Sequence, residues 1–239
     1  MNLLLLTATD LCPDGTARLA GRRVLHAREV LRAAEGDVLR VGVLGGKVGR
    51  AEIVRLSADE LVLRVELTGD PPPRAEIDLL LAVPRPKALR RILPSLASLG
   101  IDRVVLLNSA RVERSYFDSK VFAQAPELFA LGLEQARDTR PPELLVRERF
   151  RPFVEDELDG LFPASARLVA HPAAPPLERR SLPGRVLLAV GPEGGWVPFE
   201  LELLRQHGFA PFTLGPRPLR VETALPYALG ALSRSRTSP

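Results

Sequence analysis

Residues 186–196 read VLLAVGPEGGW, an apolar run that leads into a loop rich in glycine and proline. Residues 212–224 read FTLGPRPLRVETA and repeat the same order. Each segment predicts a buried strand, then a Gly/Pro-rich loop, then a helix. In an open α/β sheet, ligands bind at the loops that follow the carboxyl ends of the strands. Glycine allows a ligand to approach the backbone closely, and proline stiffens the loop. The two segments therefore predict an α/β fold with a ligand site in these loops.

The chain after residue 74 alternates between strand-like apolar runs and helical spacing, which favours a mostly parallel sheet. The run at 77–83 is typical of a strand buried on both faces. Helical spacing follows from Leu89 to Leu99 and ends at Gly100, and Pro94 is expected to kink this helix. The other expected elements are strands at 104–107, 168–170, 186–190 and 212–214, helices at 126–137 and 222–232, and a disordered polar tail at 233–239.

A linker precedes this alternating region. Residues 69–74 read GDPPPR, and three consecutive prolines permit neither a helix nor a sheet ladder. Before the linker, short runs at 3–6, 38–43, 51–56 and 61–67 predict strands, 24–33 has helical spacing, and Gly45-Gly46-Lys47 signals a hairpin. We therefore expect a small β-rich domain at 1–70 and an α/β domain at 75–239.

The composition is that of a globular protein, with 239 residues, 46% of them hydrophobic and 26% charged. The net charge is +4, and arginine, which forms bidentate contacts with phosphate and stacks on bases, supplies most of the positive charge. A single cysteine, Cys12, excludes an internal disulfide, and His26, His171 and His207 lack metal-ligand spacing. The run at 3–6 is too short for a signal peptide or a membrane span. We therefore expect a cytoplasmic protein with a nucleic-acid partner, no metal and no membrane association.

Three motifs carry a resemblance to a known class of enzymes: His171-Pro172, Gly191–Gly195 and Leu214–Ala224, in that order. Together they resemble the SPOUT class of S-adenosylmethionine-dependent methyltransferases. More narrowly, nearly the whole chain is similar to the bacterial family that methylates N3 of a uridine in 16S ribosomal RNA. The most specific part is the string from Arg217 to Ala224. Weaker support comes from residues 22–30, 99–100, 134–135 and 142–143.

The resemblance implies a C-terminal SPOUT domain with a parallel sheet and a deep trefoil knot. It also implies a small N-terminal PUA-like RNA-binding β-barrel and a homodimer. Knotted chains are rare, and neither periodicity nor composition indicates one. The implied partner is 16S ribosomal RNA in the small ribosomal subunit.

The same resemblance implies that the two loops hold S-adenosyl-L-methionine. The implied cofactor residues are His171, Leu188, Gly191, Pro192, Glu193, Gly195, Leu214, Gly215, Leu219, Thr223 and Ala224. Two of them have structural alternatives. Glu193 could cap the following helix or pin its loop, and His171 could be architectural or act as a base.

The acceptor chemistry suggests the catalytic candidates. Uracil N3 carries a proton and becomes nucleophilic once that proton leaves. An arginine could stabilise the negative charge that develops on the flanking carbonyl oxygens, and Arg217 and Arg220 are the candidates. Glu222 could accept the proton, although a carboxylate at the start of the last helix is also favoured by the helix dipole.

Basic residues in both domains are candidates for RNA contacts, as phosphate-binding surfaces require. They are Arg22, Arg23, Arg28, Arg32, Arg85, Lys87, Arg90, Arg91, Arg137 and Arg140. Three departures from the family pattern bear on this side of the site. Asp138 stands where the family usually carries arginine, 84–87 reads PRPK where the family tends to show Ser-Arg-Gly, and Pro94 interrupts a helix.

Two alternative functions remain open. One is another SPOUT enzyme that acts on tRNA, such as on a ribose 2′-hydroxyl. The other is a non-catalytic RNA-binding factor in ribosome assembly that kept the fold.

Overall fold

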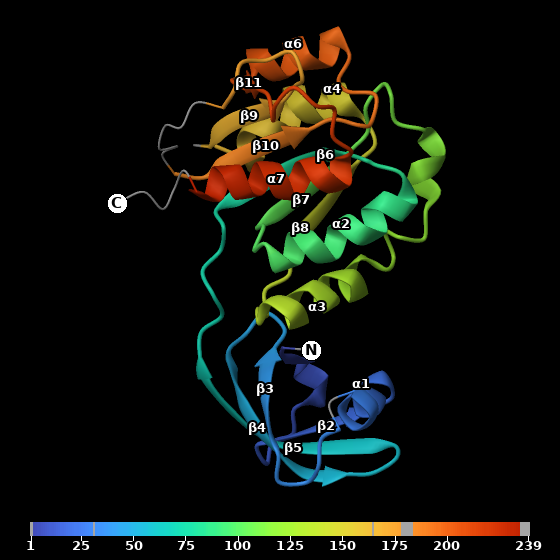
Figure 1. Ribbon diagram of the computed structural model, residues 1–239, viewed down its shortest axis with the longest axis vertical. Helices are drawn as coiled ribbons and strands as arrows, with labels where there is room; N and C mark the ends of the chain where they lie inside the picture. Colours follow the sequence, from blue (N-terminus) through green and yellow to red (C-terminus); the bar gives the residue numbers. More distant parts are fainter. Residues whose placement is uncertain (1, 31, 164, 178–183, 235–239) are drawn as a thin grey trace. The chain divides into compact units, whose positions relative to one another are not determined.

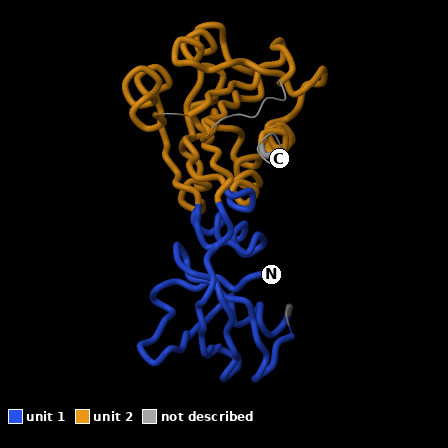
Figure 2. Tube along the Cα trace, turned by 90° about the vertical axis from the view of Figure 1, so that its left-hand side faces the viewer, with its two compact units in different colours: residues 1–73, 97–100, 126–141 blue, residues 74–96, 101–125, 142–239 orange. Residues whose placement is uncertain are grey.

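The structure is a computed structural model that describes residues 2–30, 32–163, 165–177 and 184–234 (Figure 1). The chain forms two compact units (Figure 2). Unit 1 contains residues 1–73, 97–100 and 126–141, and unit 2 contains residues 74–96, 101–125 and 142–239. Two short segments that follow the 69–74 linker in the sequence, 97–100 and 126–141, are thus part of unit 1.

Unit 1 is built on a five-stranded sheet with the order β1-β3-β4-β5-β2. β1 pairs with β3 in parallel, and the other neighbours are antiparallel. Its core contains Leu6, Leu19, Ile53, Leu61 and Leu63. The strands are β1 (Leu4–Leu6), β2 (Thr16–Ala20), β3 (Val38–Val43), β4 (Val48–Leu56) and β5 (Glu60–Gly69).

The helical parts of unit 1 differ from expectation. They are the 3₁₀ turn η1 (Ala8–Asp10), α1 (Arg22–Leu25), the π-helix η2 (His26–Val30) and α3 (Ala125–Ala136) from residue 126 onward. The helix predicted to reach Ala33 is shorter, because Arg32 has a φ of 52°, in the left-handed region that a right-handed helix cannot contain. The hairpin signal at 45–47 is confirmed: it lies between β3 and β4, and Gly45 adopts a φ of 74°.

Unit 2 contains a six-stranded sheet in which every pair is parallel, which confirms the α/β prediction. The order is β11-β9-β10-β6-β7-β8. Every residue of the two central strands is buried, as expected for strands covered on both faces. The strands are β6 (Ile77–Ala82), β7 (Arg103–Leu107), β8 (Glu143–Arg147), β9 (Ala166–Ala170), β10 (Val186–Val190) and β11 (Ala210–Phe212).

Helices cover both faces of this sheet (Figure 1). One face packs against α6 and residues 150–162, where Phe150, Phe153 and Leu204 meet Leu80 and Leu187 of the strands. Figure 1 shows α2 and α7 on the other side. The helices are α2 (Pro86–Ser98), η3 (Arg114–Asp118), α4 (Phe150–Pro152), η4 (Phe153–Glu157), α5 (Leu158–Leu161), α6 (Pro198–Gln206) and α7 (Val221–Arg234).

Several predicted boundaries in unit 2 are wrong. The last strand ends at Phe212 rather than at residue 214, because the Thr213 hydroxyl bonds both backbone groups of Gly215 and turns the chain out of the sheet. The last helix continues through Arg234, so the tail predicted from 233 begins two residues too early, and 235–239 lie outside the described residues. Gly100 ends α2 as predicted, with a φ of 70°. Pro94 lies inside that helix.

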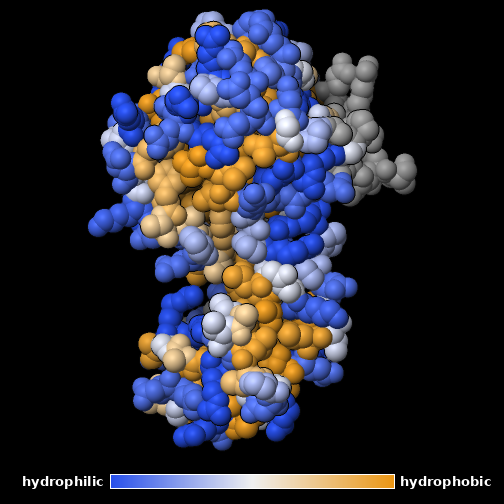
Figure 3. All heavy atoms as spheres, turned by 180° about the vertical axis from the view of Figure 1, so that it is seen from behind, coloured by the Kyte–Doolittle hydropathy of each residue, from blue (hydrophilic) through white to orange (hydrophobic). Residues whose placement is uncertain are grey.

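Several elements carry exposed apolar side chains. The largest exposures are Val38 at 61%, Tyr227 at 57% and Phe199 at 53%. Figure 3 shows hydrophobic patches separated by hydrophilic residues on one face. Among the helices that the structure describes, none has the length and apolar character needed to cross a membrane.

Candidate active site

The candidate site lies at the carboxyl ends of the strands of the unit 2 sheet. β9 is flanked by β11 and β10, and β6 follows β10. Since these strands are parallel, the segments after them, 171–177, 213–220, 191–197 and 83–85, emerge at the same edge (Figure 1). The prediction of two strand–loop–helix segments is confirmed.

The loop 191–197 is shaped by its glycines and by one tryptophan. Gly195 has a φ of 73°, and its amide donates to the carbonyl of Pro192 at 2.8 Å. A Cβ on Gly191 would lie 3.1 Å from Nε1 of Trp196. Trp196 is 6% exposed and packs on Phe150, and its Nε1 has no hydrogen-bond acceptor among the described residues. The loop therefore presents a buried donor beside a glycine backbone.

Glu200 anchors the far end of this loop, and the sequence analysis missed it. Its carboxylate is buried and accepts hydrogen bonds from the Val197 amide at 3.0 Å and the Ala110 amide at 2.7 Å. It also accepts from the Ser109 hydroxyl at 3.2 Å. The signal available in the sequence was a glutamate in the first turn after Pro198, a position that favours capping. Glu200 thus joins the loop after β10 to the segment after β7.

Arg111 makes a second connection between these two segments. Its guanidinium donates to the carbonyl of Gly194, and a Cβ on Gly194 would lie 2.9 Å from its Cδ. On the other side, the Arg85 amide points to Oε1 of Glu193 at 3.5 Å. The loop 191–197 is therefore held from two neighbouring strand ends, and the pinning alternative for Glu193 has a partner in the structure.

The loop 213–220 is held by the segment that follows β9. The Thr213 amide donates to the carbonyl of Pro175 at 2.9 Å. Gly215 has a φ of 120°, and a Cβ built on it would meet no atom within 4 Å. Leu214 is half-buried, and Leu219 is exposed. The loop therefore leaves open space around its glycine.

The carboxyl end of this loop starts helix α7. The amides of Thr223 and Ala224 donate to the carbonyl of Arg220 at 2.9 and 2.8 Å. The side chains of Arg217 and Arg220 are exposed, and neither has a hydrogen-bond or ion-pair partner in the described part of the chain. Both guanidiniums are thus available to an external group.

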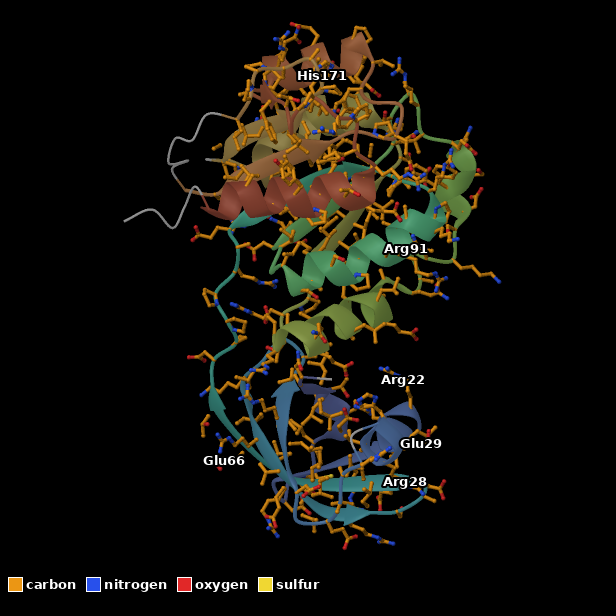
Figure 4. The ribbon with its side chains drawn as sticks, in the orientation of Figure 1. Arg22, Arg28, Glu29, Glu66, Arg91 and His171 are labelled. Carbon is orange, nitrogen blue, oxygen red and sulfur yellow. The ribbon has the colours of Figure 1, made fainter. Side chains whose placement is uncertain are left out.

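His171 follows β9 directly (Figure 4). Its amide donates to the carbonyl of Phe212 at 2.9 Å, and its Nδ1 lies 3.3 Å from the amide of Ala173, which donates to it. A neutral ring that accepts at Nδ1 carries its proton on Nε2. The acceptor nitrogen is therefore already occupied, which favours the architectural alternative over a role as base.

Glu222 forms an ion pair that the sequence did not indicate. Arg91 lies on α2 (Figure 4). Its Nη1 is 3.2 Å from Oε1 of Glu222, on α7. The side chains are 65% and 27% exposed. Such an exposed pair contributes about 0–1 kcal/mol, so an incoming substrate can separate it at little cost. A proton-acceptor candidate and an RNA-contact candidate thus share one location.

The predicted RNA-contact residues divide between the units. Arg22, Arg23, Arg28, Arg32, Arg137 and Arg140 belong to unit 1, and Arg85, Lys87, Arg90 and Arg91 belong to unit 2.

Some of these guanidiniums already have partners. Arg23 makes two hydrogen bonds to the carboxylate of Asp10, at 2.6 and 2.7 Å. Arg140 donates to the carbonyl of Pro72, and Arg90 to the side chain of Gln124 at 2.6 Å.

A scan of family models matches residues 71–233 to the RNA methyltransferase domain. Ribosomal RNA small subunit methyltransferase E of Treponema pallidum is 32% identical over 233 residues, covering 94% of this chain and 87% of the relative. The chain belongs to the RNA methyltransferase family. Within it, the similarity over nearly the full length is to ribosomal RNA small subunit methyltransferase E.

Solved structures with the same fold support this assignment to the RNA methyltransferase family. A Legionella pneumophila protein described as a methyltransferase, solved with its cofactor SAM bound, has a TM-score of 0.78 and 25% identity, covering 98% of this chain and 97% of that one. Ribosomal RNA small subunit methyltransferase E of Neisseria gonorrhoeae has a TM-score of 0.78 at 24% identity, covering 98% and 97%, which shows a common fold.

Asp138, the departure from the family pattern, has a structural role. It is 2% exposed, and its Oδ1 accepts hydrogen bonds from the amides of Thr139 at 2.6 Å and Arg140 at 3.0 Å. This carboxylate therefore holds the turn after α3. No group of three or more potential metal ligands occurs in the residues that the structure describes.

Proposed function

We propose that this protein transfers a methyl group from S-adenosyl-L-methionine to N3 of a uridine in 16S ribosomal RNA. The observation that carries the proposal is the pair of strand-end loops, 191–197 and 213–220, on a chain that belongs to the RNA methyltransferase family. The relatives are named as methyltransferases of small-subunit ribosomal RNA, which supports this RNA as the substrate. The resemblance of the Arg217–Ala224 string to the uracil family supports N3 of the uridine as the methylated atom.

The loops fit the cofactor in chemistry and in shape. The Nε1 of Trp196 is a buried donor without a partner among the described residues, and a Cβ on the adjacent Gly191 would crowd it at 3.1 Å. Open space surrounds Gly195 and Gly215. The residues that would hold the cofactor are His171, Leu188, Gly191, Pro192, Glu193, Gly195, Leu214, Gly215, Leu219, Thr223 and Ala224. When bound, S-adenosylmethionine supplies a methyl group on a positively charged sulfur.

The protein's own residues would prepare the acceptor. Arg217 and Arg220, whose guanidiniums are unengaged within the described chain, would stabilise negative charge on the uracil carbonyl oxygens as N3 loses its proton. Glu222 would accept that proton once RNA draws Arg91 away from it. Holding donor and acceptor in line supplies several kcal/mol of the barrier by itself.

Mass spectrometry of ribosomal RNA nucleosides tests the proposal. A strain that lacks this protein should lose 3-methyluridine from 16S RNA, and the purified protein with S-adenosylmethionine should restore it on small subunits from that strain. Loss of a ribose-methylated tRNA nucleoside instead would favour the alternative SPOUT activity. An unchanged nucleoside profile would favour a non-catalytic assembly factor.

Further features come with the proposed function. We propose a PUA-like RNA-binding domain at 1–70, a SPOUT domain with a deep trefoil knot at 75–239, a homodimer and a cytoplasmic location where ribosomes assemble. The fold match to the Legionella pneumophila structure over 98% of this chain supports the two-part architecture. Light scattering should report twice the mass of the chain, and a monomer at micromolar concentration would contradict the dimer.

A further inference from the structure

Unit 1 contains a cleft of about 430 Å³ that the proposed reaction does not use. It lies among β3, β4 and β5 and the residue that follows α3, all within unit 1. Its charged residues are three arginines and one glutamate, so its net charge is +2. The cleft is lined by Leu3, Arg40, Val48, Gly49, Arg50, Glu66, Thr68, Gly69 and Arg137.

Two of the arginines face each other across antiparallel strands. Arg40 on β3 and Arg50 on β4 are in direct register. Such cross-strand neighbours have Cβ atoms about 5 Å apart, and like charges at this position destabilise a sheet. Neither guanidinium has a hydrogen-bond or ion-pair partner among the residues described. The fold therefore maintains a repulsive pair at the cleft.

A neighbouring register pair, on β4 and β5, has its charges neutralised by an ion pair. Glu52 on β4 and Arg64 on β5 are in register and form an ion pair with 2.8 Å between Oε2 and Nη1. Arg50 and Glu66, the next register pair on that face, form no ion pair within the described structure. Glu66 is marked in Figure 4. The positive charge of Arg50 is thus left available in the cleft.

The third arginine is held in an unfavourable backbone conformation. Arg137 follows the last residue of α3 with a φ of 59°, where glycine is the usual residue. The next turn is fastened to the β3–β4 hairpin: the Thr139 hydroxyl donates to the carbonyl of Gly46 at 2.5 Å, and the Gly45 amide to the carbonyl of Thr139 at 2.7 Å. These contacts bring Arg137 to the cleft despite the strain.

The wall of the cleft depends on a glycine. A Cβ on Gly49 would lie 1.9 Å from the carbonyl oxygen of Glu66, where the register of β4 and β5 shifts. Any larger residue would push the two strands apart. Thr68, which is exposed beside it, adds a hydroxyl group to the lining.

We propose that this cleft binds phosphodiester groups of the substrate RNA, through Arg40, Arg50 and Arg137. Three guanidiniums with one carboxylate suit a group that carries a single negative charge at each phosphate and accepts forked hydrogen bonds. A bound phosphate also removes the repulsion between Arg40 and Arg50. This inference rests on the proposed function for the identity of the RNA, and on the cleft alone for its chemistry.

RNA binding by the full-length protein as a function of salt tests this site. Arg40→Ala, Arg50→Ala and Arg137→Gly should each weaken binding of a small-subunit ribosomal RNA fragment by roughly 10-fold. Each should also lower the slope of log K against log salt by about 0.7 to 0.9. Arg64→Ala, on the same face but paired with Glu52, is the matched control and should bind RNA like the wild type. Glu66→Gln should tighten RNA binding.

Further measurements separate the outcomes. Thermal unfolding and S-adenosylmethionine affinity, which depends on unit 2, establish that each variant is folded. If the folded arginine variants bind RNA with wild-type affinity and slope, the proposal is overturned. It is also overturned if inorganic phosphate saturates the cleft in calorimetry without displacing RNA, since the cleft would then hold a free anion. If the wild type binds RNA through these arginines but methylates no uridine, the proposed function is wrong, whereas the proposal that the cleft binds RNA is supported.

Discussion

The loops of unit 2 and the cleft of unit 1 present opposite kinds of surface to a ligand. The loops at 191–197 and 213–220 offer backbone, open glycines and one buried indole donor. The cleft offers guanidiniums from three separate segments. A surface of the first kind selects its ligand by shape, and its affinity changes little with salt. A surface of the second kind binds phosphate, and its affinity falls as the salt concentration rises. We therefore expect substitutions in the loops and in the cleft to alter cofactor binding and RNA binding separately.

The largest expected effect is at Gly195. Gly195→Val should abolish S-adenosylmethionine binding in calorimetry, because a β-branched side chain is strained at a φ of 73° and would fill the open space of the loop. Gly208→Val is the matched control, since Gly208 has a φ of 81° and equal space but lies in the turn between α6 and β11. It should lose stability and keep the cofactor. Undiminished binding by Gly195→Val would place the donor site elsewhere.

Arg220→Ala should separate chemistry from RNA binding. If Arg220 stabilises charge that develops as N3 loses its proton, single-turnover methylation at saturating ribosomal subunits should fall by about 100-fold or more, with cofactor affinity unchanged. Arg205→Ala, an exposed arginine on α6, is the control. Wild-type turnover by Arg220→Ala, with weaker RNA binding and a shallower salt dependence, would make Arg220 a phosphate contact.

Arg23 should behave unlike the arginines of the cleft, because it is already paired inside unit 1. Burial raises the pKa of Asp10, but the hydrogen bonds from Arg23 and Thr7 outweigh it, so the pKa lies below its ordinary value of 3.8. Arg23→Ala or Asp10→Asn should therefore cost about 2 kcal/mol of unfolding free energy. Arg40→Ala should cost no unfolding free energy, because it removes the repulsion with Arg50.

The pH dependence of unfolding gives an independent check on this pair. A carboxylate whose folded pKa is lowered stabilises the fold above its unfolded pKa, and this contribution disappears as the pH falls through the folded pKa. The wild type should thus lose stability below pH 3.8 more steeply than Asp10→Asn in urea unfolding. Parallel curves for the two proteins would contradict the assignment.

The smallest expected effect is a gain in stability at Arg137. Arg137→Gly should raise the free energy of unfolding by about 1 kcal/mol, because glycine adopts a φ of 59° without the cost that other residues incur. Chemical denaturation measures this. A gain in stability together with weaker RNA binding would show that the strain at Arg137 is retained for its guanidinium. A loss of stability would show that its side chain supports the fold.

Much of unit 2 could be predicted because its signals are local. The apolar runs of β6 and β10, the Gly/Pro-rich loops and the glycine that ends α2 are each encoded within a few residues, since periodicity and turn chemistry act over that range. β8 was missed because its apolar run, 144–146, is only three residues long and lies between two charged residues, on a half-buried edge strand. The helical segments at 150–161 were missed as well, and they are interrupted by a π-turn.

The sequence by itself determined the parallel sheet and the two loops of the candidate site, because each depends on neighbours along the chain. Only the tertiary structure decided which charged groups are engaged: Arg23 with Asp10, Arg91 with Glu222, and Glu200 with the segment after β7. It also assembled the cleft from Arg40, Arg50 and Arg137. Ion pairs and clefts depend on strand register and on the packing of distant segments, and charge patterns along a chain carry no record of either.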